Sequence, residues 1–221
     1  AMEAAVEREG TIHTFVRPGD RANPKWLDQN AQSFADVKVQ GGETTVWPIV
    51  SAGNSDTGHG GAATKIGSIQ AACLNLCISS TEVAHVHLGQ KMQAGIFTAD
   101  TVSAEARAIA MKSRDTVRAA FDERRFRDLI AQHQKTDKNK IEAPASAMHN
   151  IVRVSSDLHE ADLDALLSAF HDERKSVYGV GQAVARLAQD RDDVNASTKL
   201  EELAGAIMGG KHNRAILAVT Q

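Results

Sequence analysis

The chain has 221 residues, of which 42% are hydrophobic, so it is long enough for one ordinary domain with its own core. Its 25 lysines and arginines are outnumbered by 28 aspartates and glutamates, which excludes a globally basic protein that coats nucleic acid by bulk attraction. Only six Phe, two Trp and one Tyr are present, and this shortage of aromatic residues favours packed helices over a sandwich of sheets.

The N-terminal quarter differs in composition from the remainder of the chain. It contains three of the four prolines, both tryptophans and short alternating runs such as residues 36–39. We expect an extended N-terminal arm over residues 1–61, which can contain a short β-hairpin with a Gln-Gly-Gly-Glu turn at residues 40–43. Loop-forming residues are concentrated at positions 51–61, so the arm is expected to end there.

The next part of the chain shows apolar residues at helical spacing. Over residues 66–77 they recur three or four positions apart, which predicts a first helix, and a second helix is expected over residues 79–95. Cys73 and Cys77 are the only cysteines. On the first helix they would share one face as buried thiols, which is typical of a protein in a reducing compartment.

A longer helical element is expected over residues 101–133. Its apolar side changes flank partway along, which predicts a kink or break near Asp122 and Glu123. With the preceding helices, this element forms a predicted helical core with a basic helix over residues 62–135. A polar linker follows before a predicted C-terminal helical subdomain at residues 141–221.

Three helices are expected in the C-terminal subdomain, so the predicted fold class is mainly α with a core of about six helices. The first carries apolar residues up to Phe170 and the second covers residues 177–187. The third begins with a capping box at Thr198 and ends at Gly209. The short apolar stretch at residues 215–219 would need a partner surface if it were exposed.

Opposite charges are concentrated in different parts of the chain. Residues 1–60 hold 5 Lys and Arg against 8 Asp and Glu, residues 105–140 hold 10 against 6, and residues 141–221 hold 8 against 12. This distribution suits either an anionic ligand at the middle segment or head-to-tail contact between copies of the chain. The simpler interpretation is a solvated helix whose charges balance against its own neighbours.

Arginines at regular spacing are the strongest functional signal. Arg107, Arg114, Arg118 and Arg125 fall at offsets of 0, 7, 11 and 18, so on one continuous helix they would project within about 20° of one line. The planar guanidinium binds phosphate oxygens bidentately and keeps its proton near neutral pH. The predicted nucleic-acid-binding residues are Arg107, Arg114, Arg118, Arg124 and Arg125.

Local pairing is the competing explanation of these arginines. Several acidic residues lie close enough in the sequence to neutralise them: Glu105, Asp115, Asp122, Glu123 and Asp128. At exposed positions each such pair stabilises a protein by only ~0–1 kcal/mol, so a polyanion could displace the carboxylates.

A glycine-rich stretch at residues 53–58 has the first glycine spacing of a phosphate-binding loop. The two residues that follow are His59 and Gly60, where that motif requires Lys and Ser or Thr, and no hydrophobic strand is expected before it. We therefore expect a flexible hinge here and no bound nucleotide.

Two further groups of residues contain the side-chain types of metal or acid–base sites. His85 and His87 alternate as zinc ligands on a strand do, and Cys73 and Cys77 could complete a set, but the spacing matches no compact zinc module. An acidic segment with histidines covers residues 157–173, which is explained by carboxylates near the positive end of a helix dipole. No catalytic residue, metal or cofactor is therefore expected, and the chain is not expected to be an enzyme.

The sequence favours a self-assembling structural protein of nucleocapsid or coat type that binds the phosphate backbone of nucleic acid, with single-stranded RNA expected, without sequence specificity. A homo-oligomer is expected, and no membrane partner, because no apolar run reaches eighteen residues. The expected location is the cytoplasm or an assembled nucleoprotein particle. Two alternatives remain open: a helical protein-interaction adaptor with no nucleic acid, and a metal-dependent hydrolase that uses His85 or His159.

Overall fold

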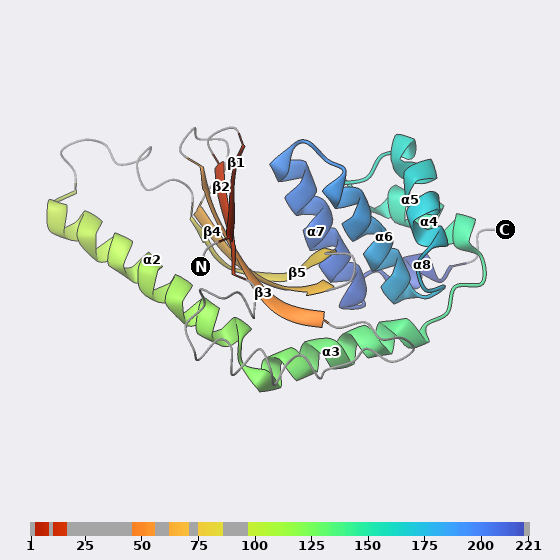
Figure 1. Ribbon diagram of the computed structural model, residues 1–221, viewed down its shortest axis with the longest axis horizontal. Helices are drawn as coiled ribbons and strands as arrows, with labels where there is room; N and C mark the ends of the chain where they lie inside the picture. Colours follow the sequence, from red (N-terminus) through yellow and green to blue (C-terminus); the bar gives the residue numbers. More distant parts are fainter. Residues whose placement is uncertain are drawn as a thin grey trace.

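The computed structural model describes residues 3–8, 11–16, 46–55, 62–70, 75–85 and 97–218 (Figure 1). Within these residues the fold is mainly helical, as the composition predicts, with seven α-helices. The helices accompany a five-stranded antiparallel sheet, which is larger than the short hairpin expected from the sequence.

The sheet is a meander in which each strand pairs with the next one along the chain. Neighbouring strands are antiparallel throughout, and β3 pairs with β4 from Val46 opposite Gln70 to Gly53 opposite Ala63. The strands are β1 (Glu3–Arg8), β2 (Thr11–Val16), β3 (Val46–Ser55), β4 (Ala62–Gln70) and β5 (Leu76–His85).

The helices predicted over residues 66–77 and from residue 79 onward are wrong, because residues 66–70 belong to β4 and residues 76–85 to β5. Leu76, Cys77 and Ile78 are buried one after another, so the strand is covered on both faces and lacks the alternation that identifies a half-exposed strand. Register shifts in the pairing of β4 with β5 disturb the period further. A doubly buried strand of this kind cannot be distinguished from a buried helix by spacing alone.

Other predictions for the N-terminal part concern residues that the structure does not describe. The turn at residues 40–43, residues 86–95 of the second expected helix, and Cys73 lie outside the described residues. The boundary expected at residue 61 falls between the paired strands β3 and β4. The division into an arm, a core and a C-terminal subdomain stays a prediction.

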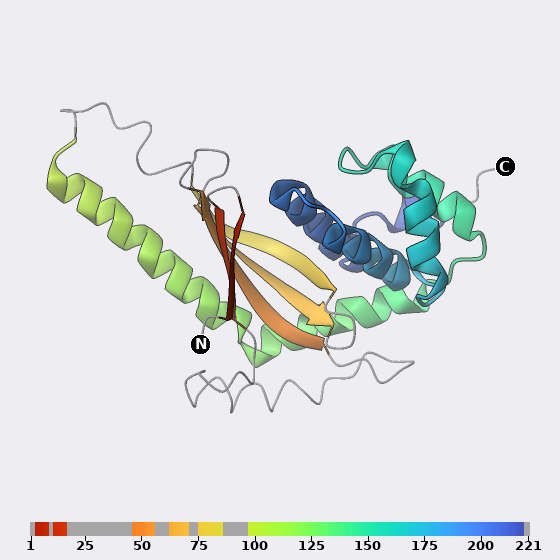
Figure 2. The same ribbon diagram turned by 45° about the horizontal axis from the view of Figure 1, so that its top comes forward.

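The long helical element is broken, as its apolar pattern predicts. Helix α2 (Ala99–Ala120) ends at Phe121, and α3 (Glu123–Lys138) begins after Asp122, whose carboxylate accepts a hydrogen bond of 2.9 Å from the Arg125 backbone N–H. This junction is called the elbow below, and Figure 2 shows it beside the sheet. Buried apolar residues from the elbow pack against β3 in one cluster: Val46, Val50, Ala120, Phe121, Phe126 and Ile130.

The C-terminal part contains more helices than the sequence predicts. They are α4 (Pro144–Val154), the short 3-10 helix η1 (Glu160–Asp162), α5 (Leu163–His171), α6 (Val177–Gln189), α7 (Val194–Met208) and α8 (Asn213–Ile216). Helix α4 was missed, although Pro144 at its first position is a typical start signal. Helix α7 starts before the predicted capping box because Asp193 caps it, and it ends at Gly209 as predicted.

Helix α7 lies between the sheet and the other C-terminal helices (Figures 1 and 2). It approaches β5 so closely that a Cβ atom built on Gly205 would lie 1.9 Å from the carbonyl oxygen of Ile78. Buried polar groups add a second link, since Asn75 donates to the Gln182 side chain at 2.8 Å and accepts from Gln189 at 2.8 Å. These contacts fix the helices to the sheet edge.

We expect the substitution Gly205→Ala to lower the free energy of unfolding by about 1–3 kcal/mol, because the added methyl group forces α7 away from β5. Urea denaturation measures the change. Gly209→Ala is a matched control, since Gly209 has a φ of −74° that alanine adopts freely, and its effect should stay below about 1 kcal/mol. An equal decrease in the free energy of unfolding for the two variants would contradict the claim that the close α7–β5 contact requires glycine at position 205.

Candidate nucleic-acid interface

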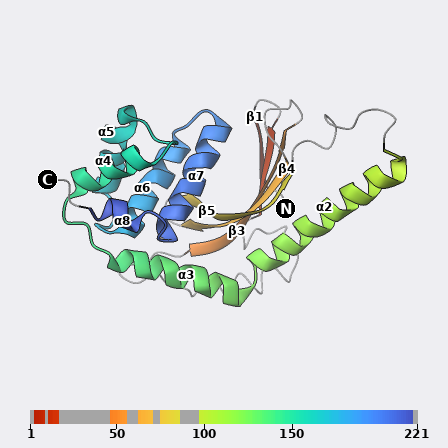
Figure 3. The same cartoon turned by 180° about the vertical axis from the view of Figure 1, so that it is seen from behind.

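Most residues of helix α2 are exposed. Figure 3 shows it extending away from the sheet and from the C-terminal helices. Its buried residues are Thr116 and Ala120, both near its C-terminal end, where Thr64 of β4 also lies 3.1 Å from Ser113 between hydroxyl oxygens. The first half of the helix therefore has little contact with the described part of the chain.

Three of the predicted site residues lie on the open face of α2. At 100° per residue, Arg107, Arg114 and Arg118 point roughly 160–200° away from Thr116, which faces the sheet. All three side chains are exposed. They cover an axial length of about 16 Å on one side of the helix.

The expectation that Arg125 continues the same line is wrong. The elbow separates α2 from α3, so Arg124 and Arg125 project from the first turn of a second helix that runs in another direction. Both are nevertheless exposed. The five residues together, Arg107, Arg114, Arg118, Arg124 and Arg125, are called the arginine surface below.

Local pairing accounts for only a small part of this surface. Arg114 pairs with Asp115 at 3.0 Å, with both side chains more than half exposed. Arg127, next to the surface, pairs with Glu123. Within the described residues, no ion pair involves Arg107, Arg118, Arg124 or Arg125, and Asp122 is occupied as the cap of α3. Within the described residues, local pairing therefore accounts for Arg114 and forms no ion pair with the other four.

A cavity of about 140 Å³ opens beside the arginine surface, between the elbow and the sheet. Its walls are mostly apolar, and the exposed Arg125 belongs to both the cavity and the arginine surface. We call it the elbow pocket, and its lining includes Ile66, Ser79, Ala119, Arg125, Phe126 and Leu129. Sequence patterns do not predict it, because β4, β5, α2 and α3 form it together only in the folded chain.

Comparison with known proteins identifies no family for the chain. No family model, curated protein or solved structure matches it. Among the described helices, none is both long and apolar enough to cross a bilayer. Functional conclusions therefore depend on the geometry of the chain itself.

The zinc and phosphate-loop alternatives gain no support within the described residues. Cys77 is buried in β5, His85 ends that strand, and His87 lies outside the described residues. In the part of the chain that the structure describes, no three His, Cys, Asp or Glu side chains gather as metal ligands would. The expectation that no strand precedes the glycine-rich stretch is wrong, because β3 runs to Ser55 within it. The next described element is strand β4 and not the helix that a phosphate loop requires.

The acidic segment at residues 157–173 has a structural role at Asp162. Asp162 is buried, forms an ion pair with Arg191 at 2.5 Å and accepts a hydrogen bond of 2.9 Å from the His159 backbone N–H. Burial alone would raise the pKa of Asp162, but these two partners outweigh it and hold that pKa below its usual value. Asp162 thus links η1 to the end of α6 through its ion pair with Arg191.

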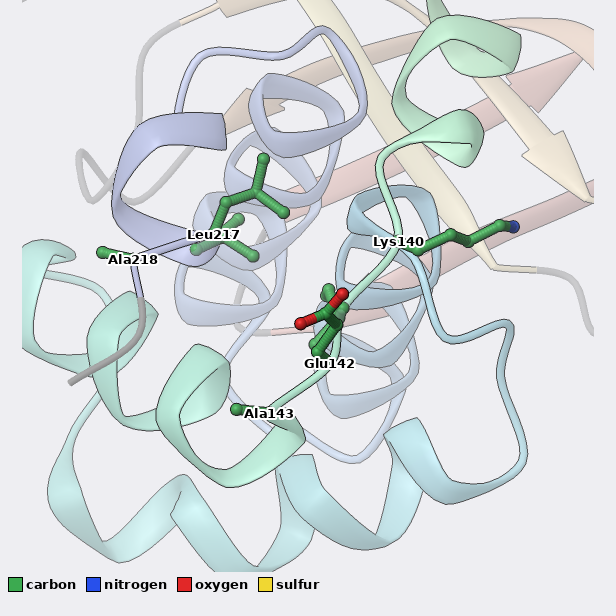
Figure 4. A pocket seen from close by; sticks show the side chains of 7 residues that line it. Lys140, Glu142, Ala143, Leu217 and Ala218 are labelled. Carbon is green, nitrogen blue, oxygen red and sulfur yellow. The ribbon is translucent and has the colours of Figure 1, made fainter. Parts of the chain in front are cut away.

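The apolar C-terminal stretch contacts the rest of the chain through Ile216 and the backbone of Ala218. Ile216 of α8 is buried, and the Asn150 side chain of α4 donates a hydrogen bond of 2.8 Å to the carbonyl of Ala218. A cavity of about 90 Å³ remains beside it, where Leu217 and Ala218 lie near Ala143 and the charged Lys140 and Glu142 (Figure 4). Ile216 therefore already has its partner surface within the chain, while Leu217 and Ala218 stay exposed and Val219 lies outside the described residues.

Glu201 of α7 has the most strongly perturbed carboxylate in the contact between α7 and the sheet. Burial raises the pKa of Glu201 to about 7, while Lys65 lowers it and the neighbouring Glu202 raises it. Lys65 itself is bound by Glu202 at 2.7 Å. Glu201 therefore loses its proton near neutral pH, while the ion pair of Lys65 is with Glu202.

We expect Glu201 to make the fold less stable as the pH rises. Its pKa is higher in the folded chain than its ordinary value of 4.5, so its stabilising contribution is complete below about pH 4.5 and is lost as the pH rises through about 7. Glu201→Gln should raise the free energy of unfolding by about 2–3 kcal/mol at pH 8 and leave it unchanged at pH 4.5. Urea denaturation at both pH values, with the exposed Glu160→Gln as control, checks this; identical pH profiles for all three proteins would contradict it.

Proposed function

We propose that the protein binds single-stranded nucleic acid, with RNA as the expected polymer, through the phosphate backbone along the arginine surface, and that copies of the chain assemble on it. The observation that carries this proposal is the exposure of five arginines, four of which have no carboxylate partner within the described residues. Exposed guanidinium groups without partners are available to phosphate oxygens at little cost.

Binding of this kind would not depend on sequence. The arginine surface offers mainly charge to the phosphates, which are the same at every position of a strand. Condensed counterions released from the polymer would supply much of the free energy, so the affinity should fall steeply as salt is added. The protein would then act as a coat or nucleocapsid component, in the cytoplasm or within a nucleoprotein particle.

The exposure of α2 supports the assembly part of the proposal. A helix that packs against little else in the described chain is only marginally stable in water by itself. Two large apolar side chains at this end of the fold are also exposed: Phe97 at 51% and Met111 at 47%. Contact between copies, with the acidic C-terminal part of one chain near the basic helices of the next, would cover these groups.

Freshly purified protein tests the proposal. We expect an absorbance ratio at 260 and 280 nm above that of pure protein, together with a native mass of several chains, and both should fall after nuclease treatment in high salt. A helical adaptor that binds an acidic protein partner is the second candidate, favoured by Met111 lying beside the arginines on α2. A clean monomer or dimer with no nucleic acid would support that candidate and contradict the first.

A further inference from the structure

The elbow pocket has a chemistry that differs from the open arginine surface beside it. Ile66, Ala119, Phe126 and Leu129 make its walls apolar, while the guanidinium of Arg125 and the hydroxyl of Ser79 supply its polar groups. The Ser79 hydroxyl donates to the Ile66 carbonyl at 3.1 Å, which leaves its oxygen free to accept a hydrogen bond. Apolar walls with a few polar groups are typical of a site that binds a small organic group.

Arg125 belongs both to the elbow pocket and to the arginine surface along which the phosphates are proposed to bind. Its backbone is fixed in the first turn of α3 by the hydrogen bond from its N–H to Asp122, and its side chain is exposed while it lines the cavity. A polyanion that follows the arginines from α2 to α3 therefore passes the pocket entrance. The bases of a single strand are unpaired and can leave the strand to enter such a cavity.

We propose that the elbow pocket holds one unpaired base of the single-stranded nucleic acid whose phosphates follow the arginine surface. The base lies between the apolar wall and the plane of the Arg125 guanidinium, a stacking arrangement that every base can adopt. The inference rests on the proposed function. It adds a preference for strands that carry bases over polyanions that lack them, which the arginine surface alone would not produce.

Three probes of equal charge separate the pocket from the arginine surface: a twelve-nucleotide oligouridylate, an abasic oligonucleotide of the same length, and inorganic polyphosphate. With the wild-type chain at one low salt concentration, we expect the oligouridylate to bind about tenfold more tightly than the other two. Ala119→Leu fills the pocket and should remove this difference without weakening polyphosphate binding. Ala108→Leu, an equal change on the exposed side of α2, should preserve it.

Each other result overturns the inference in a recognisable way. Equal binding of all three probes by the wild-type chain, a comparison that requires no variant, would remove the base pocket and leave the proposed function standing. Binding of none of them would remove both. An acidic peptide bearing a leucine whose binding is lost in Ala119→Leu, while the three probes bind both proteins alike, would assign the pocket to a protein partner instead.

Discussion

The double substitution of Arg114→Glu and Arg118→Glu is expected to weaken binding of single-stranded RNA strongly while leaving the fold intact. Both side chains are exposed on the face of α2 that points away from the sheet, so their replacement disturbs no buried contact. Two charge-assisted hydrogen bonds to phosphate contribute roughly 3–6 kcal/mol. Their loss, with repulsion added, should weaken binding by more than about 100-fold in a fluorescence anisotropy titration.

A matched control separates the loss of these sites from the change in net charge. Lys199→Glu with Lys211→Glu changes the charge of the chain by the same amount, on exposed residues of the C-terminal part. We expect this variant to bind RNA within about threefold of the wild-type chain, since a distant charge is screened within about 10 Å at 0.1 M salt. Unchanged affinity of the α2 double variant at low salt, in protein with the wild-type circular dichroism spectrum, would exclude the arginine surface as the binding site.

The substitution Asp137→Ala should cause the largest loss of stability among single changes discussed for this chain. Asp137 is buried at the end of α3, where it pairs with Arg174 at 2.9 Å and accepts a hydrogen bond of 2.8 Å from the fully buried Ser176 hydroxyl. Breaking a buried pair costs about 3–5 kcal/mol, and because water still reaches part of Arg174 we expect about 2–4 kcal/mol here. The melting temperature should fall by about 5–15 °C.

The large loss of stability is expected because Asp137 links the end of α3 to the segment before α6. The segment after α3 pairs with the segment before α6, through hydrogen bonds of 3.0 Å from Ile141 to the Lys175 carbonyl and from Val177 to the Asn139 carbonyl. Asp128→Ala, an exposed acidic position on the same helix, is the control and should change stability by less than about 0.5 kcal/mol. An equal decrease in melting temperature for both variants would contradict the claim that Asp137 stabilises the contact between α3 and α6.

The helical part of the fold could be predicted from the sequence because its signals are local. The change of apolar flank near Asp122 correctly located the break between α2 and α3, and Gly209 marked the end of α7. By contrast, β4 and β5 were mistaken for helices, since Leu76, Cys77 and Ile78 are buried in succession and carry no two-residue period.

The candidate site could be predicted only in part for a similar reason. The exposed arginines of α2 follow from helical spacing along a single element. The elbow pocket depends on residues as distant in sequence as Ile66 and Leu129, which only tertiary packing brings together. Even the direction of Arg125 could not be inferred before the break in the helix was known.

The salt dependence of RNA binding by the wild-type chain tests the central claim most directly. If the five residues of the arginine surface each neutralise one phosphate of a single strand, the logarithm of the association constant should fall against the logarithm of salt concentration with a slope of about −3.5. The Arg114→Glu, Arg118→Glu variant should show a slope no steeper than about −2. No measurable binding at low salt, or a slope that is the same for both proteins, would contradict phosphate binding by these arginines.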